Sequence, residues 1–170
     1  MFKYMTVVRK SIIIINNGGM MDEDINFKDI ALISRIDDET TLENYGGKIN
    51  TSFFESANLL GGLKVKELVS FEQSISGHSP VKLTHKAHTI LNLLKEKSDE
   101  KFNNLDQAIL TAISNGADNH NKIEKQVNVA SFDIALHIYK LYKKGYLEYF
   151  IQSGRIIIRL TEIKRYMKLR

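Results

Sequence analysis

The chain of 170 residues contains no cysteine, no tryptophan and a single proline. Without cysteine, a disulfide scaffold, a thiol nucleophile and a thiolate zinc site are all excluded. No apolar run approaches the roughly 20 residues that a membrane-spanning helix needs, because the longest, Ile12 to Ile15, follows Arg9 and Lys10 closely. Residues 1–17 also lack the small-residue cleavage site of a signal peptide. We therefore expect a cytoplasmic protein that does not enter the membrane.

The overall composition is that of a globular protein. Hydrophobic residues make up 43% of the chain and charged residues 26%, which excludes a disordered or collagen-like chain. The length suffices for one domain or for two small ones.

Charge is divided unevenly between the two halves of the chain. Residues 1–100 carry 12 Lys and Arg against 14 Asp and Glu, a net of −2, whereas residues 101–170 carry 12 against 6, a net of +6. Positive charge clustered in one half favours a polyanionic partner, most simply nucleic acid. A lysine-rich solvated face would give the same balance. Charge alone leaves both interpretations open.

The second half has the patterning of three helices and a hairpin. Apolar residues at helical spacing predict helices over 105–115, 119–127 and 132–144, the last capped by Ser131 and ended by Gly145. The β-branched and aromatic segments YLEYFI (146–151) and RIIIRL (155–160), separated by Gln152-Ser153-Gly154, predict a β-hairpin. A last helix is expected over Thr161–Leu169.

The first half repeats this order in longer form. We expect helices over Phe27–Ile36, Thr40–Tyr45 and Ser52–Leu68, then strands over 68–74 and 81–84 and a helix over 85–97. The polar stretch 95–104 marks a boundary. These signals divide the chain into an N-terminal extension (1–19, a probable strand), a first module (20–98) and a second module (99–170), which look like a duplication.

Three helices followed by a two-stranded hairpin and a further helix is the order of the winged-helix fold. The segment from Ser131 onward, with LYKKGYLEY, QSGR and IIIRLTEIKRYM, and the segment LVSFEQSISGHSPVKLTHKAHTIL carry the similarity. Two such copies in one short chain resemble the tandem winged-helix DNA-binding proteins of archaea. The fold class expected is thus α+β, mainly α, with two winged-helix modules in tandem.

The resemblance also implies a DNA-binding surface. In a winged-helix protein the third helix enters the major groove and the hairpin wing lies along the backbone or minor groove. Third-helix side chains would then read bases, and lysines and arginines of the second helix and the wing would neutralise phosphates. The implied set comprises Asn119, Asn121, Lys122, Lys125, Ser131, His137, Lys140, Lys144, Arg155 and Arg159, with Asp133 beside the base-reading residues.

Two features weaken direct base readout. The first two turns of the third helix, SFDIALH, contain no Arg, Lys, Asn or Gln, the residues that best fit purine edges. His137 is either a base or phosphate contact or a plain exposed helix residue. The first module has only Lys64 and Lys66 near its third helix, so we expect it to bind a protein or to pair instead.

Catalysis and metal binding have little support in the sequence. His78, His85 and His88 are close together but lack a carboxylate triad or an HExxH arrangement. The acidic runs 22–24 and 37–39 precede helices, where the helix dipole favours acids. We expect no enzyme activity, cofactor or metal.

Two functions from different classes remain. The leading hypothesis is a non-enzymatic protein that binds double-stranded DNA, a transcription regulator or chromatin-associated factor. The alternative is a tandem winged-helix subunit of a larger transcription, chromosome or membrane-remodelling complex, with a protein partner on its N-terminal module. The run Ile12 to Ile15 would be a poor exposed edge, so we expect it to be buried against the first module or against a second subunit. Of the two, we favour the second, a homodimer.

Overall fold

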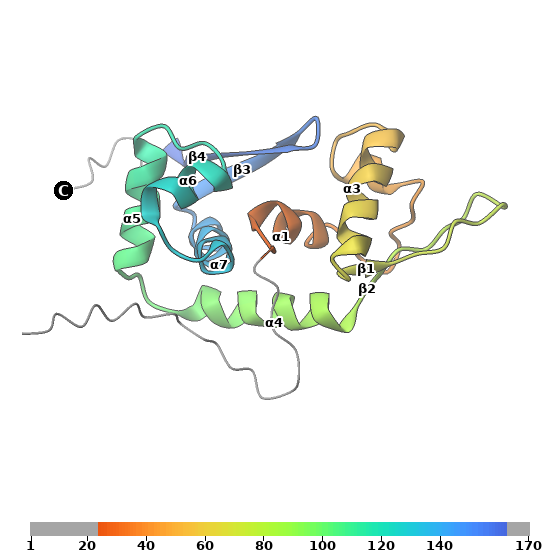
Figure 1. The fold of residues 1–170 in the computed structure, drawn as a ribbon, viewed down its shortest axis with the longest axis horizontal. Coiled ribbons are helices and arrows are strands. Elements are labelled where there is room, and N and C mark those ends of the chain that lie inside the picture. The colour runs from red at the N-terminus through yellow and green to blue at the C-terminus, as the bar shows by residue number, and fades with distance from the viewer. Residues whose placement is uncertain (1–23, 163–170) are drawn as a thin grey trace, which may run out of the picture.

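The computed structural model describes residues 24–162. Within this range the protein is α+β and mainly helical, with seven helices and two separate two-stranded antiparallel sheets (Figure 1). In chain order the elements are α1 (Phe27–Ile33), α2 (Tyr45–Lys48), α3 (Phe53–Val65), β1 (Val69–Ser70), β2 (Lys82–Leu83), α4 (His85–Asp99), α5 (Asn104–Ser114), α6 (His120–Val127), α7 (Ser131–Lys143), β3 (Leu147–Gln152) and β4 (Arg155–Leu160).

The helices begin at residues whose side chains satisfy free backbone amides. Asn26 and Asn103 each form a capping box with an aspartate three residues on, Asp29 and Asp106. The side chains of Ser52, Thr84 and Asn119 cap α3, α4 and α6 by accepting from a backbone N–H of the first turn, without the return bond of a capping box. Each such cap is worth about 1 kcal/mol, so local sequence alone fixes most helix starts.

The long hairpin β3–β4 is closed by a two-residue turn. Ser153 and Gly154 both have positive φ angles, 46° and 66°, as the type I′ turn that matches strand twist requires. The register pairs Gln152 with Arg155 and Leu147 with Leu160. Strand alternation then places one set of side chains against the helices and leaves the other set towards solvent.

The same hydrogen bonds occur in both halves, 77 or 78 residues apart. After the third helix of each half, Leu68 N donates to Leu63 O and Tyr146 N donates to Leu141 O, both at 2.9 Å. After each hairpin, Thr84 N donates to Leu68 O and Thr161 N donates to Tyr146 O. In each half, the loop between the first two helices also bonds to the second strand of the hairpin. Val81 N, just before β2, donates to Thr40 O, and Ile158 N in β4 donates to Asp118 O. The two halves therefore share local geometry as well as element order.

The halves do not stand apart, because one continuous hydrophobic core runs through both. The central helix α1 packs against α7, and α4 crosses α7 and packs against it as well (Figure 1). The ring of Phe27 in α1 meets that of Tyr149 in β3 edge-on, with centroids 5.1 Å apart. Helices that belong to the first half by sequence thus cover the third helix of the second.

Several sequence predictions are confirmed and several are wrong. The helices from α3 to α7 and the hairpin β3–β4 lie close to their expected ranges. The helix expected over Thr40–Tyr45 is wrong: Thr41 instead forms a β-bridge with Pro80, and α2 starts at Tyr45. A β-branched pair, Thr40-Thr41, suits this extended pairing better than a helix. β1 and β2 are only two residues long each.

Two expectations fall outside what the structure describes. They are the strand in residues 1–19, with Ile12 to Ile15, and most of the helix over Thr161–Leu169.

Candidate nucleic-acid interface

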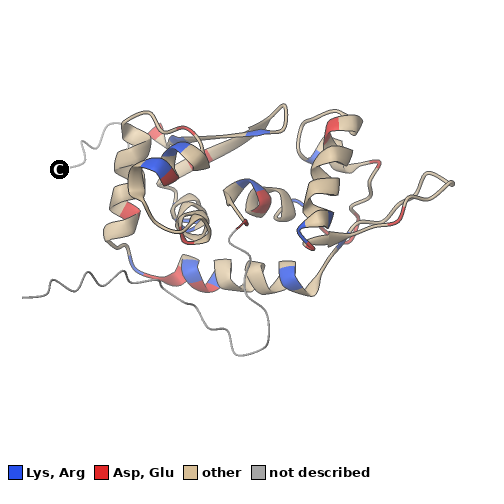
Figure 2. Cartoon of the chain, viewed as in Figure 1, with Lys and Arg blue, Asp and Glu red and all other residues tan. Residues whose placement is uncertain are grey.

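Six of the ten residues proposed to bind DNA are exposed on the second half. They are Asn121, Lys122, Lys125, Lys144, Arg155 and Arg159. In Figure 2, basic and acidic residues alternate along α6 and recur on both halves of the molecule. In the described part of the chain, basic positions along the backbone are thus interspersed with acidic ones.

Nearby carboxylates neutralise two of these cations. Lys122 Nζ lies 2.9 Å from Asp118 Oδ1, and Arg159 Nε donates to Glu148 Oε1 at 2.7 Å. No side-chain hydrogen bond, ion pair or ring contact among residues 24–162 involves Lys125, Lys144 or Arg155. These three are the cations free to meet an anion.

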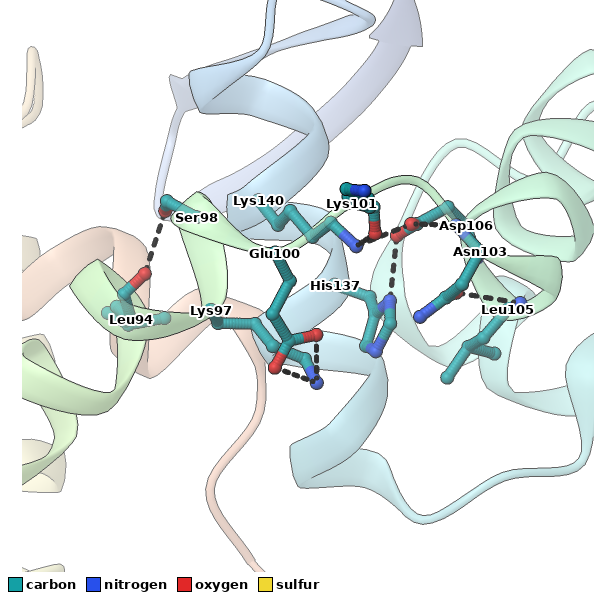
Figure 3. A network of polar contacts seen from close by, with 10 residues as sticks. All are labelled: Leu94, Lys97, Ser98, Glu100, Lys101, Asn103, Leu105, Asp106, His137 and Lys140. Atoms are coloured by element: carbon teal, nitrogen blue, oxygen red, sulfur yellow. Dashed lines mark hydrogen bonds and ion pairs between the residues drawn. The ribbon is translucent and has the colours of Figure 1, made fainter.

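The placement expected for His137 and Lys140 is wrong. Both lie on α7 but are buried, 4% and 0% exposed, and both face Asp106 of α5 (Figure 3). His137 Nδ1 is 2.7 Å from Asp106 Oδ1, and Lys140 Nζ is 2.6 Å from Asp106 Oδ2. Lys140 Nζ also donates to the backbone carbonyl of Lys101, in the connection between α4 and α5, at 2.7 Å. Neither side chain can reach a base edge.

Asp106 is the residue that sequence reasoning missed. Its capping box with Asn103 was visible as an Asn-x-x-Asp pattern, but nothing local marks it as the partner of a buried lysine. Burial alone would raise the pKa of the Asp106 carboxyl, yet the hydrogen bonds from Lys140 and His137 outweigh it and hold that pKa below its ordinary value. Burial lowers the pKa of His137, so a neutral His137 donates its Nδ1 proton to an ionised Asp106.

Asn119 and Ser131 have structural partners. Asn119 caps α6 by accepting from Lys122 N at 3.1 Å. Ser131 was expected to cap α7, but no side chain caps that helix, and Ser131 Oγ instead lies 2.7 Å from Nε2 of buried His120. His120 Nδ1 accepts from the backbone N–H of Phe27 at 3.4 Å. His120 was not among the predicted site residues, and it joins α6 to α1 in the other half.

This contact sets the proton position on His120. Because Nδ1 accepts, Nε2 of the neutral ring carries the proton and donates to Ser131. Burial lowers the pKa of His120 to about 4, although Asp29 raises it slightly. A histidine in this tautomer cannot take a proton from Ser131, so the pair does not form an activated nucleophile.

The hairpin wing is also held by the other half. A Cβ on Gly154, in the turn between β3 and β4, would overlap Oε1 of Glu55 on α3. The Glu55 carboxylate accepts from Thr51 Oγ1. The tip of hairpin β3–β4 thus lies against α3 of the first half.

Histidine and carboxylate side chains are dispersed in the described part of the chain. His78, His85 and His88 are exposed, and no cluster of three or more His, Asp or Glu side chains that could hold a metal occurs among residues 24–162. No helix in the described part of the chain has the length and apolarity to cross a bilayer.

Comparison with known proteins leaves the family open. No family model matches the chain, and no curated protein matches it. Among solved structures, that of ScpB from Mycobacterium tuberculosis is similar at 13% identity, over 89% of this chain and 100% of that one, with a TM-score of 0.32. A similarity at this TM-score carries no argument about fold or function.

Proposed function

We propose that the protein is a non-enzymatic tandem winged-helix subunit of a larger assembly, which acts through protein contacts and not by reading a DNA sequence. The repeated order of three helices, a hairpin and a following segment supports the tandem winged-helix part of this proposal. The hydrogen bonds that recur 77 or 78 residues apart support it further, because unrelated segments would not share them at a constant spacing.

The observation that carries the functional part is the burial of α7. This is the helix that would enter the major groove in a DNA-binding winged-helix protein. Here seven of its residues, from Ile134 to Leu141, are buried, His137 and Lys140 among them. Helices α1 and α4 pack against it. Only Lys143 of this helix is exposed, so the helix offers little surface to DNA.

The absence of an enzyme activity is part of the proposal. Its support is the Ser131–His120 pair, whose proton is on the wrong nitrogen for base catalysis. The Asp106 cluster is fully buried and has no access for a substrate.

The test is the size of the native assembly. We expect the protein in extract of its source cells to elute from a sizing column well above its own 19.5 kDa, and to stay there after nuclease treatment. Elution as a free chain, or a shift to the free chain on nuclease treatment, would contradict an interaction subunit.

Sequence-independent DNA binding is a second candidate, favoured by the three unpaired cations Lys125, Lys144 and Arg155. Contacts to phosphates alone would make the affinity strongly salt-dependent and indifferent to sequence. Fluorescence anisotropy with a random duplex, across a salt series, tests this candidate. Reversing all three residues to Glu should weaken the binding and lower the salt slope by roughly three, one per lost contact.

A matched control for charge comes from the first half. Lys82 and Lys95 are exposed and have no partner among the described residues. Changing them to Glu alters net charge in the same direction but should leave the salt slope unchanged. Equal loss in both sets would mean that only net charge matters, and no binding at low salt would remove the DNA candidate.

A further inference from the structure

Hairpin β3–β4 turns one face to solvent. Its side chains form three cross-strand pairs: Gln152 with Arg155, Phe150 with Ile157, and Glu148 with Arg159. The central apolar pair is 41% exposed at Phe150 and 38% exposed at Ile157. Two large apolar side chains side by side on a strand pair form a small platform bordered by a guanidinium group at each end.

The platform is rigid because the inner face of the hairpin packs on α1 and the turn of the hairpin packs on α3. On the inner face Tyr149 packs edge-on against Phe27 of α1. At the tip, Gly154 lies against Glu55 of α3. Little conformational entropy would be lost when a partner binds such a surface.

The two arginines differ in whether their guanidinium groups already have partners. Arg159 is paired with Glu148, and its guanidinium carbon lies 4.3 Å above the centre of the Phe150 ring. Arg155 has neither an ion pair nor a ring contact in the described structure. Glu55 of α3 lies next to Gly154, but its carboxylate accepts a hydrogen bond from Thr51 and makes no ion pair with Arg155. Arg155 therefore presents its donors to solvent.

We infer that this face binds a segment of a partner protein that carries a carboxylate next to an apolar side chain. The carboxylate pairs with the planar guanidinium of Arg155, which fits it bidentately. The apolar side chain covers Phe150 and Ile157. The inference rests on the proposed function as an interaction subunit and names the surface and the chemistry of its partner.

The same face suits nucleic acid poorly. Arg159 already covers one face of the Phe150 ring, so a base would have to displace this guanidinium to stack there. Glu148 places a negative charge beside the platform, where it would repel a phosphate. A peptide needs to place only one carboxylate, at Arg155, and Arg155 lies at the opposite end of the three pairs from Glu148.

The test is a selection from a random dodecamer peptide library on the full chain. We expect enriched peptides with Asp or Glu beside Leu, Ile or Phe. Synthesised peptides from this set should bind Arg155→Glu and Ile157→Ser about tenfold more weakly than the unchanged protein. Lys82→Glu, an equal charge change on the other hairpin, should bind normally. Circular dichroism confirms that each variant is folded.

A charge swap makes the result specific to one contact. A peptide whose acidic residue is replaced by Lys should bind Arg155→Glu better than it binds the unchanged protein. Enriched peptides that bind both hairpin variants as tightly as the unchanged protein would contradict binding at this surface and leave the proposed function standing. Failure to enrich any acidic–apolar motif would also overturn it, as would oligo-dT binding that depends on Arg155. Loss of the large native assembly is the separate result that contradicts the proposed function.

Discussion

Acidification should weaken the joint between the two halves through His120. Nδ1 of this histidine accepts from the backbone of Phe27 in α1, and the side chain is only 7% exposed. A proton on Nδ1 would remove that acceptor and place a charge in an apolar site. The groups that face the ring are Asp29 from α1, Ser131 from α7 and Glu124 from its own helix, whose carboxylate is 3.8 Å from Nε2. Burial outweighs the opposing charge of Asp29, and the pKa of His120 falls to about 4.

The size of the effect follows from the difference between the folded and unfolded states. The ordinary histidine pKa of 6.5 applies to the unfolded chain, and the pKa of about 4 applies to the folded one. Between these values the unfolded chain binds more protons, so stability falls as the pH falls. The full difference corresponds to about 3 kcal/mol, and about 2 kcal/mol of it is lost by pH 5. The contribution is complete above about pH 7.

Urea unfolding at pH 7.5 and at pH 5.0 measures this contribution directly. We expect the unchanged protein to lose about 2 kcal/mol more of its unfolding free energy than His120→Gln, which cannot titrate. His137 is present in both proteins, so its own protonation cancels in the comparison. Equal losses in the two proteins, or an NMR titration of His120 near pH 6.5, would refute the assignment of a buried neutral ring.

Two further predictions concern packing and turn geometry. Asp106→Asn leaves the buried ammonium of Lys140 without its counter-ion and should cost about 3 to 5 kcal/mol in thermal or urea unfolding; a cost below about 1 kcal/mol would show that the pair is solvated. Gly154→Ala forces a side chain onto Glu55 at a positive φ angle and should destabilise the protein by about 1 to 3 kcal/mol. The matched change Gly61→Ala, in α3 where nothing lies within 4 Å, should instead stabilise it by up to about 1 kcal/mol. The same sign for both glycine changes would contradict the contact at the wing tip.

Local signals made much of the fold predictable. The hairpin β3–β4 follows from two β-branched and aromatic runs around Ser153-Gly154, because strand propensity and turn chemistry agree there. Asn119 and Ser52 mark helix starts by their side-chain caps. Such features depend on neighbours within a few residues, which a sequence displays.

The burial of His137 and Lys140 depends on contacts far along the chain. Ile134, Ile138 and Leu141 define one apolar face of α7, and the opposite face reads as solvent-exposed when the helix is taken alone. That face is closed by Asp106, 34 residues from Lys140. One hint was present, since α7 has apolar residues on nearly all sides, which is typical of a helix buried within a protein.

The position of α4 has a practical consequence for anyone who dissects this chain. The helix continues the first half in sequence but packs against α7 of the second, as α1 does. A fragment that starts at residue 99 would expose apolar surface on α7 and would lack Phe27, which packs against Tyr149. Affinity for DNA or for protein measured on such a fragment would report an artificial face that the intact polypeptide never displays.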